Sequence, residues 1–84
     1  MLQLIRLPEV IESTGMKRPT VYAAMGNCLF PRPIKLGRKL SAWPLNEVQS
    51  IIAARIAGKS NEEIRALVAE LTEARKNCLA EIPA

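Results

Sequence analysis

Residues 8–26 read PEVIESTGMKRPTVYAAMG, a stretch that predicts two short helices joined by a turn. The first helix is expected from about Pro8 to Thr14, because proline suits the first turn of a helix. Gly15 follows directly and tolerates the positive φ with which many helices end. This stretch therefore predicts a helix-turn-helix.

The second helix of the pair is expected to begin near Arg18-Pro19 and to end by Gly26-Asn27. Val21 and Met25 are four residues apart and so fall on one face, which is expected to be the buried face. The outer face then carries Pro19, Thr20, Tyr22 and Ala23. Small residues on that face would let the helix approach a partner closely.

A β-hairpin is predicted after the helix pair. Residues 30–33 read FPRP, and two prolines so close together exclude a helix there. Apolar and charged residues then alternate, and Gly37 lies where a turn would join strands at residues 34–36 and 40–43. The apolar side of this ribbon, with Phe30 or Trp43, is expected to pack on the helices. A base-stacking role for Trp43 is the alternative, but the chain has few aromatic residues and this one precedes the helix-starting Pro44.

Two further helices are predicted in the second half of the chain. One runs from Pro44 to about Ala57 and is stopped by Gly58; its apolar stripe consists of Val48, Ile51, Ile52 and Ile56. Ser60 and Glu63 have the spacing of a capping box that begins the other, which continues to about Leu79. Its apolar stripe is Ile64, Leu67, Val68, Leu71, Ala74 and Cys78. This stripe either folds back on the domain or pairs with another chain.

Positive charge is concentrated in the first half of the chain. Residues 1–43 hold seven basic and two acidic side chains, a net charge of +5, whereas residues 44–84 have a net charge of −1. Six of the basic residues and no acidic residue lie between Lys17 and Lys39. Such a one-sided field attracts a polyanion, so nucleic acid is the expected partner.

The composition gives little support to other classes of protein. The chain of 84 residues has no histidine and two cysteines 50 positions apart, so we expect no metal site, no cofactor and no enzymatic activity. Cys28 and Cys78 are expected to be buried free thiols. No apolar run is long enough to cross a membrane, and Arg6 and Pro8 interrupt any signal peptide, so a cytoplasmic protein is expected.

Six short motifs stand in an order and spacing that resemble the AlpA family of prophage and genomic-island regulators. They are Arg6-Leu7-Pro8-Glu9-Val10, Thr14-Gly15-Met16, Thr20-Val21-Tyr22, Phe30-Pro31-Arg32-Pro33, Leu36-Gly37-Arg38, and Trp43-Pro44 with Glu47-Val48. The resemblance covers about residues 6–55. It implies a winged helix-turn-helix of the MerR-like and excisionase-like kind, whose second helix enters the major groove. The hairpin would be the wing, lying on the DNA backbone or in a minor groove.

Three positions depart from the pattern of that family. Lys17 replaces a frequent serine cap, Cys28 stands near the usual helix-ending glycine, and Ile51-Ile52 replaces a pair that often includes tryptophan. The second departure shifts the expected turn onto Gly26-Asn27. None of the three removes the expected DNA-binding surface.

The candidate DNA-binding residues lie on the second helix and on the hairpin. They are Lys17, Arg18, Thr20, Tyr22, Lys35, Arg38 and Lys39. Arg18 is suited to guanine, Thr20 or Tyr22 to phosphate, and Lys17 to phosphate. The hairpin cations suit phosphate or the minor groove, and they also discourage edge-to-edge pairing of the exposed strand. The alternative for the helix residues is a solvated face, with Tyr22 half-packed against the wing.

The expected fold is therefore mainly α with a two-stranded hairpin: a winged helix-turn-helix over residues 1–58 and a C-terminal amphipathic helix over residues 59–84. The expected function is sequence-specific binding of duplex DNA, as a transcriptional regulator, an excision factor or both. An integrase, the transcription machinery or a second copy are further candidate partners. The alternative is a protein-interaction adaptor acting through the C-terminal helix. Deleting residues 60–84 is expected to abolish association and to spare DNA binding.

Overall fold

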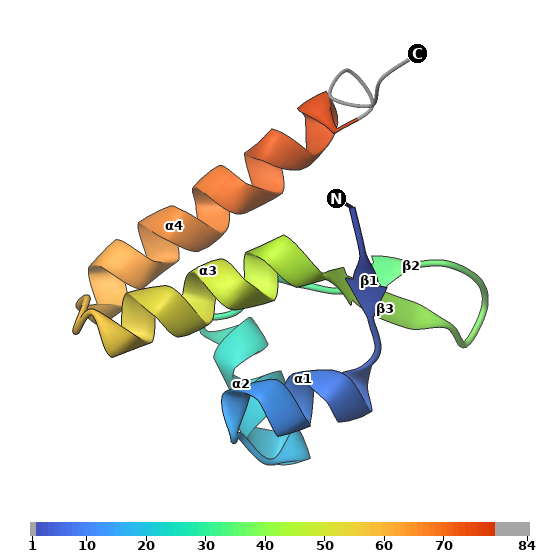
Figure 1. Ribbon diagram of the computed structural model, residues 1–84, viewed down its shortest axis with the longest axis horizontal. Helices are drawn as coiled ribbons and strands as arrows, with labels where there is room; N and C mark the ends of the chain where they lie inside the picture. Colours follow the sequence, from blue (N-terminus) through green and yellow to red (C-terminus); the bar gives the residue numbers. More distant parts are fainter. Residues whose placement is uncertain (1, 79–84) are drawn as a thin grey trace.

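The structure is a computed structural model that describes residues 2–78. Within these residues it has four α-helices and a small antiparallel sheet, so it is mainly helical as predicted (Figure 1). In chain order the elements are β1 (Leu4–Ile5), α1 (Leu7–Thr14), α2 (Arg18–Gly26), β2 (Ile34–Lys35), β3 (Ser41–Pro44), α3 (Leu45–Ile56), α4 (Asn61–Ala74) and the 3₁₀ turn η1 (Arg75–Asn77). The last helix was expected to continue to about Leu79, but α4 ends at Ala74 and the chain tightens into the 3₁₀ turn η1; Leu79 itself lies outside the described residues.

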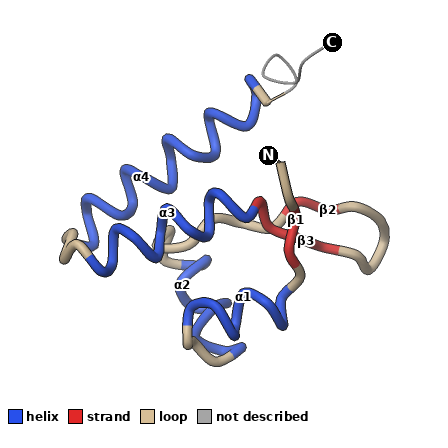
Figure 2. The backbone as a smooth tube through the Cα atoms, in the orientation of Figure 1, coloured by secondary structure: helices blue, strands red, loops and turns tan. Residues whose placement is uncertain are grey.

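Figure 2 shows α3 in the middle of the molecule, with α4 on one side and the α1–α2 pair on the other. The sheet lies at the end where α3 begins, and the β2–β3 loop extends away from the helices. This arrangement is compatible with a small helix-turn-helix domain. It places the N-terminal end of α1 next to the sheet.

The sheet contains the predicted hairpin and one strand that the sequence did not indicate. The strand order is β1-β3-β2, with Ile34 opposite Ala42 in the hairpin and Ile5 opposite Trp43 on the other edge of β3. The backbone N–H of Leu45 extends this edge by donating to the carbonyl of Gln3 at 2.7 Å. A two-residue strand has too little sequence to show alternation, which is why β1 was not predicted.

The two helices of the predicted pair form where the sequence indicates. Val10 and Val21 are fully buried and belong to one apolar cluster, while Gly15 ends α1 with a φ of 74°. The N–H of Gly15 donates to the carbonyl of Ile11 at 3.0 Å. The outer face of α2 is exposed at the predicted positions Pro19, Thr20, Tyr22 and Ala23.

α2 ends at Gly26 with Asn27 as its C-cap, as predicted, but the turn that follows differs from the expected one. The turn was expected to use Gly26-Asn27, but the residue with the left-handed backbone is Cys28, at a φ of 60°. Cys28 is also exposed, and Cys78 is only partly buried, so neither thiol is the fully buried core residue that was expected. Both cysteines are free. The turn is set by the backbone bonds from Leu29 to Ala24 and from Cys28 to Met25 rather than by the nearest glycine.

The core joins the C-terminal helix to the rest of the chain. Ile64 and Val68 of α4 pack in one cluster with Val48 and Ile51 of α3 and with residues of α1, α2 and the sheet. The apolar stripe of α4 therefore folds back on the domain, which was one of the two expected arrangements. Ile56 was predicted to face the core but is 82% exposed, because it is the last residue of α3 and borders a hollow, also lined by Met16 and Ala24, instead of packing in the core.

The hairpin rests on the core through its aromatic residues. Phe30 and Trp43 are buried and meet edge to face, with their ring centroids 6.3 Å apart. The indole N–H of Trp43 donates to the carbonyl of Pro31 at 2.8 Å, so this residue is a core residue as expected. Leu36 was expected to pack on the helices with Ile34, yet it is exposed because the β2–β3 loop projects past them.

Candidate nucleic-acid interface

A basic hollow lies between the start of α1, the start of α2 and the hairpin. Its volume is about 460 Å³, and its lining includes the cations Arg6, Arg18, Lys35 and Lys39 as well as Tyr22. None of the described residues that line it is acidic. We call the surface formed by these five residues the basic hollow.

Each cation of the basic hollow comes from a different local structure. Arg6 is the residue between β1 and α1, Arg18 is the first residue of α2, Lys35 belongs to β2, and Lys39 stands in the β2–β3 loop. All four are exposed. The fold therefore brings together charges that come from both ends of the first half of the chain.

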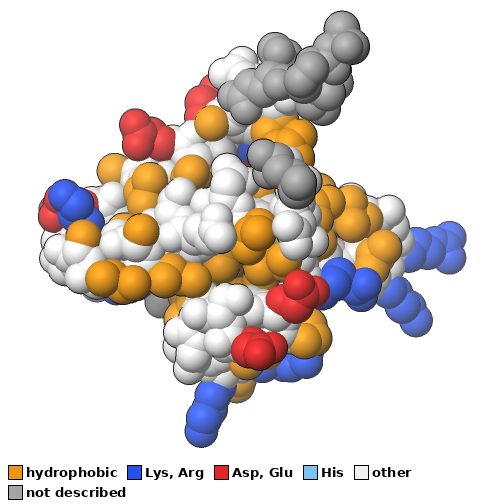
Figure 3. Space-filling view, viewed as in Figure 1, with side chains coloured by type: hydrophobic (Ala, Val, Ile, Leu, Met, Phe, Trp, Pro, Cys, Tyr) orange, Lys and Arg blue, Asp and Glu red, His pale blue; other side chains and the backbone are white. Residues whose placement is uncertain are grey.

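None of these four cations forms an ion pair with another described residue, although the Glu9 carboxylate accepts from the backbone N–H of Arg6 at 3.4 Å. Within residues 2–78, the ion pairs of the structure use other basic residues, namely Lys59, Arg75 and Lys76. Figure 3 shows Lys and Arg side chains over the hairpin and at the edge formed by α1 and α2, where Asp or Glu side chains also lie. A cluster of exposed like charges is suited to binding an anion, because the anion removes the repulsion.

The first turn of α2 adds to the positive potential. Lys17 is the residue before the helix and makes no side-chain cap, and the turn contains no acidic residue. The positive end of the helix dipole therefore lies beside Lys17 and Arg18 rather than beside a carboxylate. Backbone N–H groups in such a turn are suited to a phosphate group.

The structure brings together some of the predicted residues and leaves others apart. Arg18, Tyr22, Lys35 and Lys39 line the basic hollow. Lys17, Thr20 and Arg38 are exposed but do not line it. The first two flank it at the start of α2, and Arg38 stands in the β2–β3 loop.

Arg6 belongs to the basic hollow although the sequence did not single it out as a candidate. It is one of the seven basic residues of the first half and begins the first family motif, but neither observation marked it as a DNA-binding candidate. Its position follows from the pairing of Ile5 with Trp43, which lays the end of β1 along the sheet. The signals in the sequence were its charge and its place in that motif.

Other kinds of site find no support in the described residues. No group of three or more His, Cys, Asp and Glu side chains within residues 2–78 is placed to hold a metal ion. None of the helices in the same residues is both long and apolar enough to cross a membrane.

Comparison with known proteins gives two relevant matches. A family model described as "Prophage CP4-57 regulatory protein (AlpA)" matches residues 3–56. A protein of Enterobacteria phage P4, described as "Uncharacterized protein ORF88", is 39% identical over 57 residues. That match covers 68% of this chain and 65% of the phage protein, so it spans slightly less than two thirds of the relative. No solved structure matches the chain.

The family model includes every residue of the basic hollow and ends at the last residue of α3, so α4 lies outside it. The matched region is well over half of the chain. The motifs from Arg6 to Val48 and the helix pair with its hairpin fall within that region. The chain therefore belongs to the AlpA family of prophage regulatory proteins.

Proposed function

We propose that this protein is a winged helix-turn-helix that binds duplex DNA with sequence specificity and regulates a prophage or an integrated genomic island. The observation that carries the proposal is the basic hollow, where Arg6, Arg18, Lys35 and Lys39 meet without an acidic residue. A regulatory family and an unneutralised cationic surface between a helix and a hairpin together favour DNA over other polyanions.

In this proposal α2 enters the major groove. Arg18, at its first turn, is the base-reading residue, since base contacts concentrate at the N-terminal end of a recognition helix. Thr20 and Tyr22 are exposed on the same helix and have hydroxyl groups for phosphate oxygens. The small side chains Pro19 and Ala23 on the outer face leave room for the groove wall.

The hairpin is the wing in this proposal. Lys35 and Lys39 line the basic hollow beside Arg18. In this position their ammonium groups would contact the phosphate backbone that separates the major groove from the adjacent minor groove. Arg38 is exposed in the loop that extends away from the helices and would reach the backbone or the adjacent minor groove. Lys17 would contact a phosphate at the other end of the surface.

The protein would act without catalysis, by occupying a promoter or by shaping an attachment site for an integrase. Residues 1–58 would present the DNA surface, and residues 59–84 would support it. The rival function, an adaptor that binds protein through α4, is less favoured because Ile64 and Val68 are already buried against the protein's own core.

A fluorescence-anisotropy titration against the DNA that flanks the protein's own gene tests the proposal. Arg18→Ala is expected to weaken specific binding by about 1–3 kcal/mol and to relax sequence preference. Arg6→Ala and Lys39→Ala are expected to weaken binding to all duplexes and to reduce the slope of log K against log salt by about one each. Lys76→Ala, which removes one exposed charge that does not line the basic hollow, is the matched control and should change neither quantity.

Three results would count against the proposal. Failure of the wild-type protein to bind any duplex at low salt would exclude DNA as the partner. An effect of Lys76→Ala as large as that of Lys39→Ala would show that net charge, and not the basic hollow, carries binding. Equal competition by unrelated duplex DNA would show that the protein binds DNA without sequence specificity, and this would exclude the proposed regulatory role.

A further inference from the structure

We infer that Arg75, at the end of α4 and outside the region that the family model matches, is a positioning residue that holds the hairpin cations in place for DNA. The inference rests on the proposed function. It concerns a guanidinium group that does not line the basic hollow.

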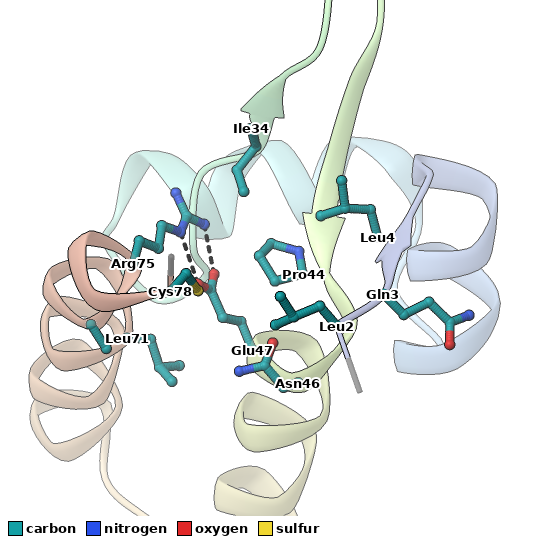
Figure 4. A pocket seen from close by; sticks show the side chains of 11 residues that line it. Leu2, Gln3, Leu4, Ile34, Pro44, Asn46, Glu47, Leu71, Arg75 and Cys78 are labelled. Atoms are coloured by element: carbon teal, nitrogen blue, oxygen red, sulfur yellow. Dashed lines mark hydrogen bonds and ion pairs between the residues drawn. The ribbon is translucent and has the colours of Figure 1, made fainter. Parts of the chain in front are cut away.

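Arg75 joins three separate parts of the chain. Its Nε donates to Glu47 Oε2 at 2.8 Å, and its Nη2 donates both to Glu47 Oε1 at 2.6 Å and to the backbone carbonyl of Arg32 at 2.8 Å. Figure 4 shows the two side chains pointing at one another across a groove, Glu47 from α3 and Arg75 from the end of the C-terminal helix. We call these three hydrogen bonds the Arg75 clasp.

The carboxylate in the Arg75 clasp is buried. Glu47 is 3% exposed, and it is the one charged residue among the described residues that is buried to this degree. A buried carboxylate needs a charged and hydrogen-bonded partner, so Arg75 is fixed in place by Glu47. The guanidinium is then a rigid point from which the second N–H of Nη2 reaches the Arg32 carbonyl.

The loop that Arg75 reaches is packed into the core at Pro31, which is fully buried, but it has few hydrogen bonds beyond that residue. Pro31 and Pro33 have no N–H groups, so residues 31–33 can be fastened mainly through their carbonyl oxygens. The carbonyl of Pro31 accepts from the indole of Trp43, and the carbonyl of Arg32 accepts from Arg75. Together with the burial of Pro31, these two bonds hold the loop that leads directly into β2.

The strand β2 depends on that loop for its position. β3 is the central strand: β1 pairs with one of its edges, and its C-terminal end continues directly into α3. β2 pairs with β3 over two residue pairs, extended by the bond from the Leu36 N–H to the Leu40 carbonyl at 2.7 Å. The other edge of β2 has no strand partner in the described sheet. Pro33, just before β2, and Lys35, within it, both line the basic hollow. Loosening Arg32 therefore moves the hairpin cations relative to Arg18.

A lysine at position 75 would not serve the same purpose. The guanidinium has donors in a fixed planar fork, which lets it bind both carboxylate oxygens and a carbonyl at once. An ammonium group is a point charge on a flexible stem and would satisfy Glu47 without holding Arg32. Arg75→Lys thus keeps the charge and loses the positioning.

A double-mutant cycle with DNA affinity as the readout tests the inference. Lys39→Ala and Lys17→Ala are each measured in the wild-type and in the Arg75→Lys background, on protein shown to be folded by circular dichroism. The effect of Lys39→Ala is expected to shrink by roughly twofold or more in the Arg75→Lys background, as for residues that act through one network. The effect of Lys17→Ala, at the start of α2, is expected to be the same in both backgrounds.

A second variant guards against loss of folding. The pair Glu47→Leu with Arg75→Met replaces the ion pair by apolar side chains of similar size, a change that proteins often tolerate. It removes the bond to Arg32 without leaving a buried charge. As with Arg75→Lys, the effect of Lys39→Ala on DNA affinity should therefore shrink in this background, while the effect of Lys17→Ala should not change. Additive effects of Lys39→Ala in both backgrounds would overturn the inference. Equal coupling to Lys39 and Lys17 would overturn it too, since that pattern indicates a general loss of structure.

A readout without DNA separates this inference from the proposed function. Trp43 is the only tryptophan, and its indole is bonded to the same loop, so its emission reports the loop directly. Arg75→Lys is expected to shift this emission to longer wavelength as water reaches the indole, while Lys76→Ala leaves it unchanged. If the wild-type protein binds no DNA, the proposed function fails, but the emission shift still tests whether the Arg75 clasp fastens the loop. An unchanged emission in Arg75→Lys would overturn the inference.

Discussion

At the scale of single residues, the least expected feature is the backbone of Cys28. A left-handed conformation destabilises the folded state by about 1–2 kcal/mol when the residue has a side chain. Glycine avoids this strain, but its greater freedom in the unfolded chain lowers the free energy of unfolding by about 0.5–1 kcal/mol. Cys28 has a φ of 60° and is exposed, so its side chain contributes no core contact to offset the strain. Cys28→Gly is therefore expected to raise the free energy of unfolding by about 0.5–1 kcal/mol, measured by urea denaturation.

The neighbouring residue supplies the control for this substitution. Asn27 has a φ of −96°, which any residue adopts without strain. Asn27→Gly should therefore lower the free energy of unfolding by about 0.5–1 kcal/mol, the ordinary cost of glycine's freedom. A decrease for Cys28→Gly as well would show that no strain is stored at this turn.

At the scale of elements, the start of α4 is held by a reciprocal pair of hydrogen bonds. The Ser60 hydroxyl accepts from the N–H of Glu63 at 3.2 Å, and the Glu63 carboxylate accepts from the N–H of Ser60 at 3.1 Å. This is the capping box that the sequence predicted. Ser60→Ala is expected to lower stability by about 1 kcal/mol, which for a domain of this size lowers Tm by roughly 4–8 °C in a thermal melt.

Acid provides a second check on the same capping box. The hydrogen bonds from the Ser60 backbone and side chain, and then the charge of Lys59, lower the pKa of Glu63. The box therefore contributes stability above the ordinary glutamate pKa of about 4.3, and that contribution is lost as pH falls through the lower native pKa. The Tm difference between wild type and Glu63→Ala should shrink from pH 7 to pH 3; an unchanged difference would exclude the ionised carboxylate as the source.

At the scale of the whole molecule, α4 is part of the core rather than an appendage. Ile64 is fully buried and Val68 is 9% exposed, and burial of such side chains contributes about 1.5–3 kcal/mol each. Loss of Arg75 would leave Glu47 buried without a partner, at a cost of about 3–5 kcal/mol. Together these contributions approach the roughly 5–15 kcal/mol that is typical of a whole domain.

A chain ending at residue 59 is therefore expected to lose cooperative unfolding and, with it, DNA binding. This reverses what the sequence suggested, namely that deletion of residues 60–84 would spare the DNA-binding half. Circular dichroism during a urea titration would decide between the two. A sigmoidal transition with native-like helix content for the shortened chain would contradict the expectation drawn from the structure.

Features set by near neighbours in the chain were predictable. The helix pair, the positive φ of Gly15, the capping box and the hairpin all depend on residues within a few positions of one another, and each formed close to its expected place. The exposure of Arg18 and of the hairpin cations likewise follows from the charge pattern. Ile56 was misplaced because helical spacing shows which residues share a face but not where the neighbouring elements end.

Features that join distant segments were decided by the tertiary structure alone. Arg6 reaches the basic hollow because Ile5 pairs with Trp43, and Arg75 reaches Glu47 and Arg32 because α4 packs back along α3. Such contacts depend on which buried faces fit together, and this choice is made by packing over the whole core rather than by any local preference. The sequence alone thus determined the helices, the hairpin and their charge, while the packing of β1 and α4 determined how those charges meet.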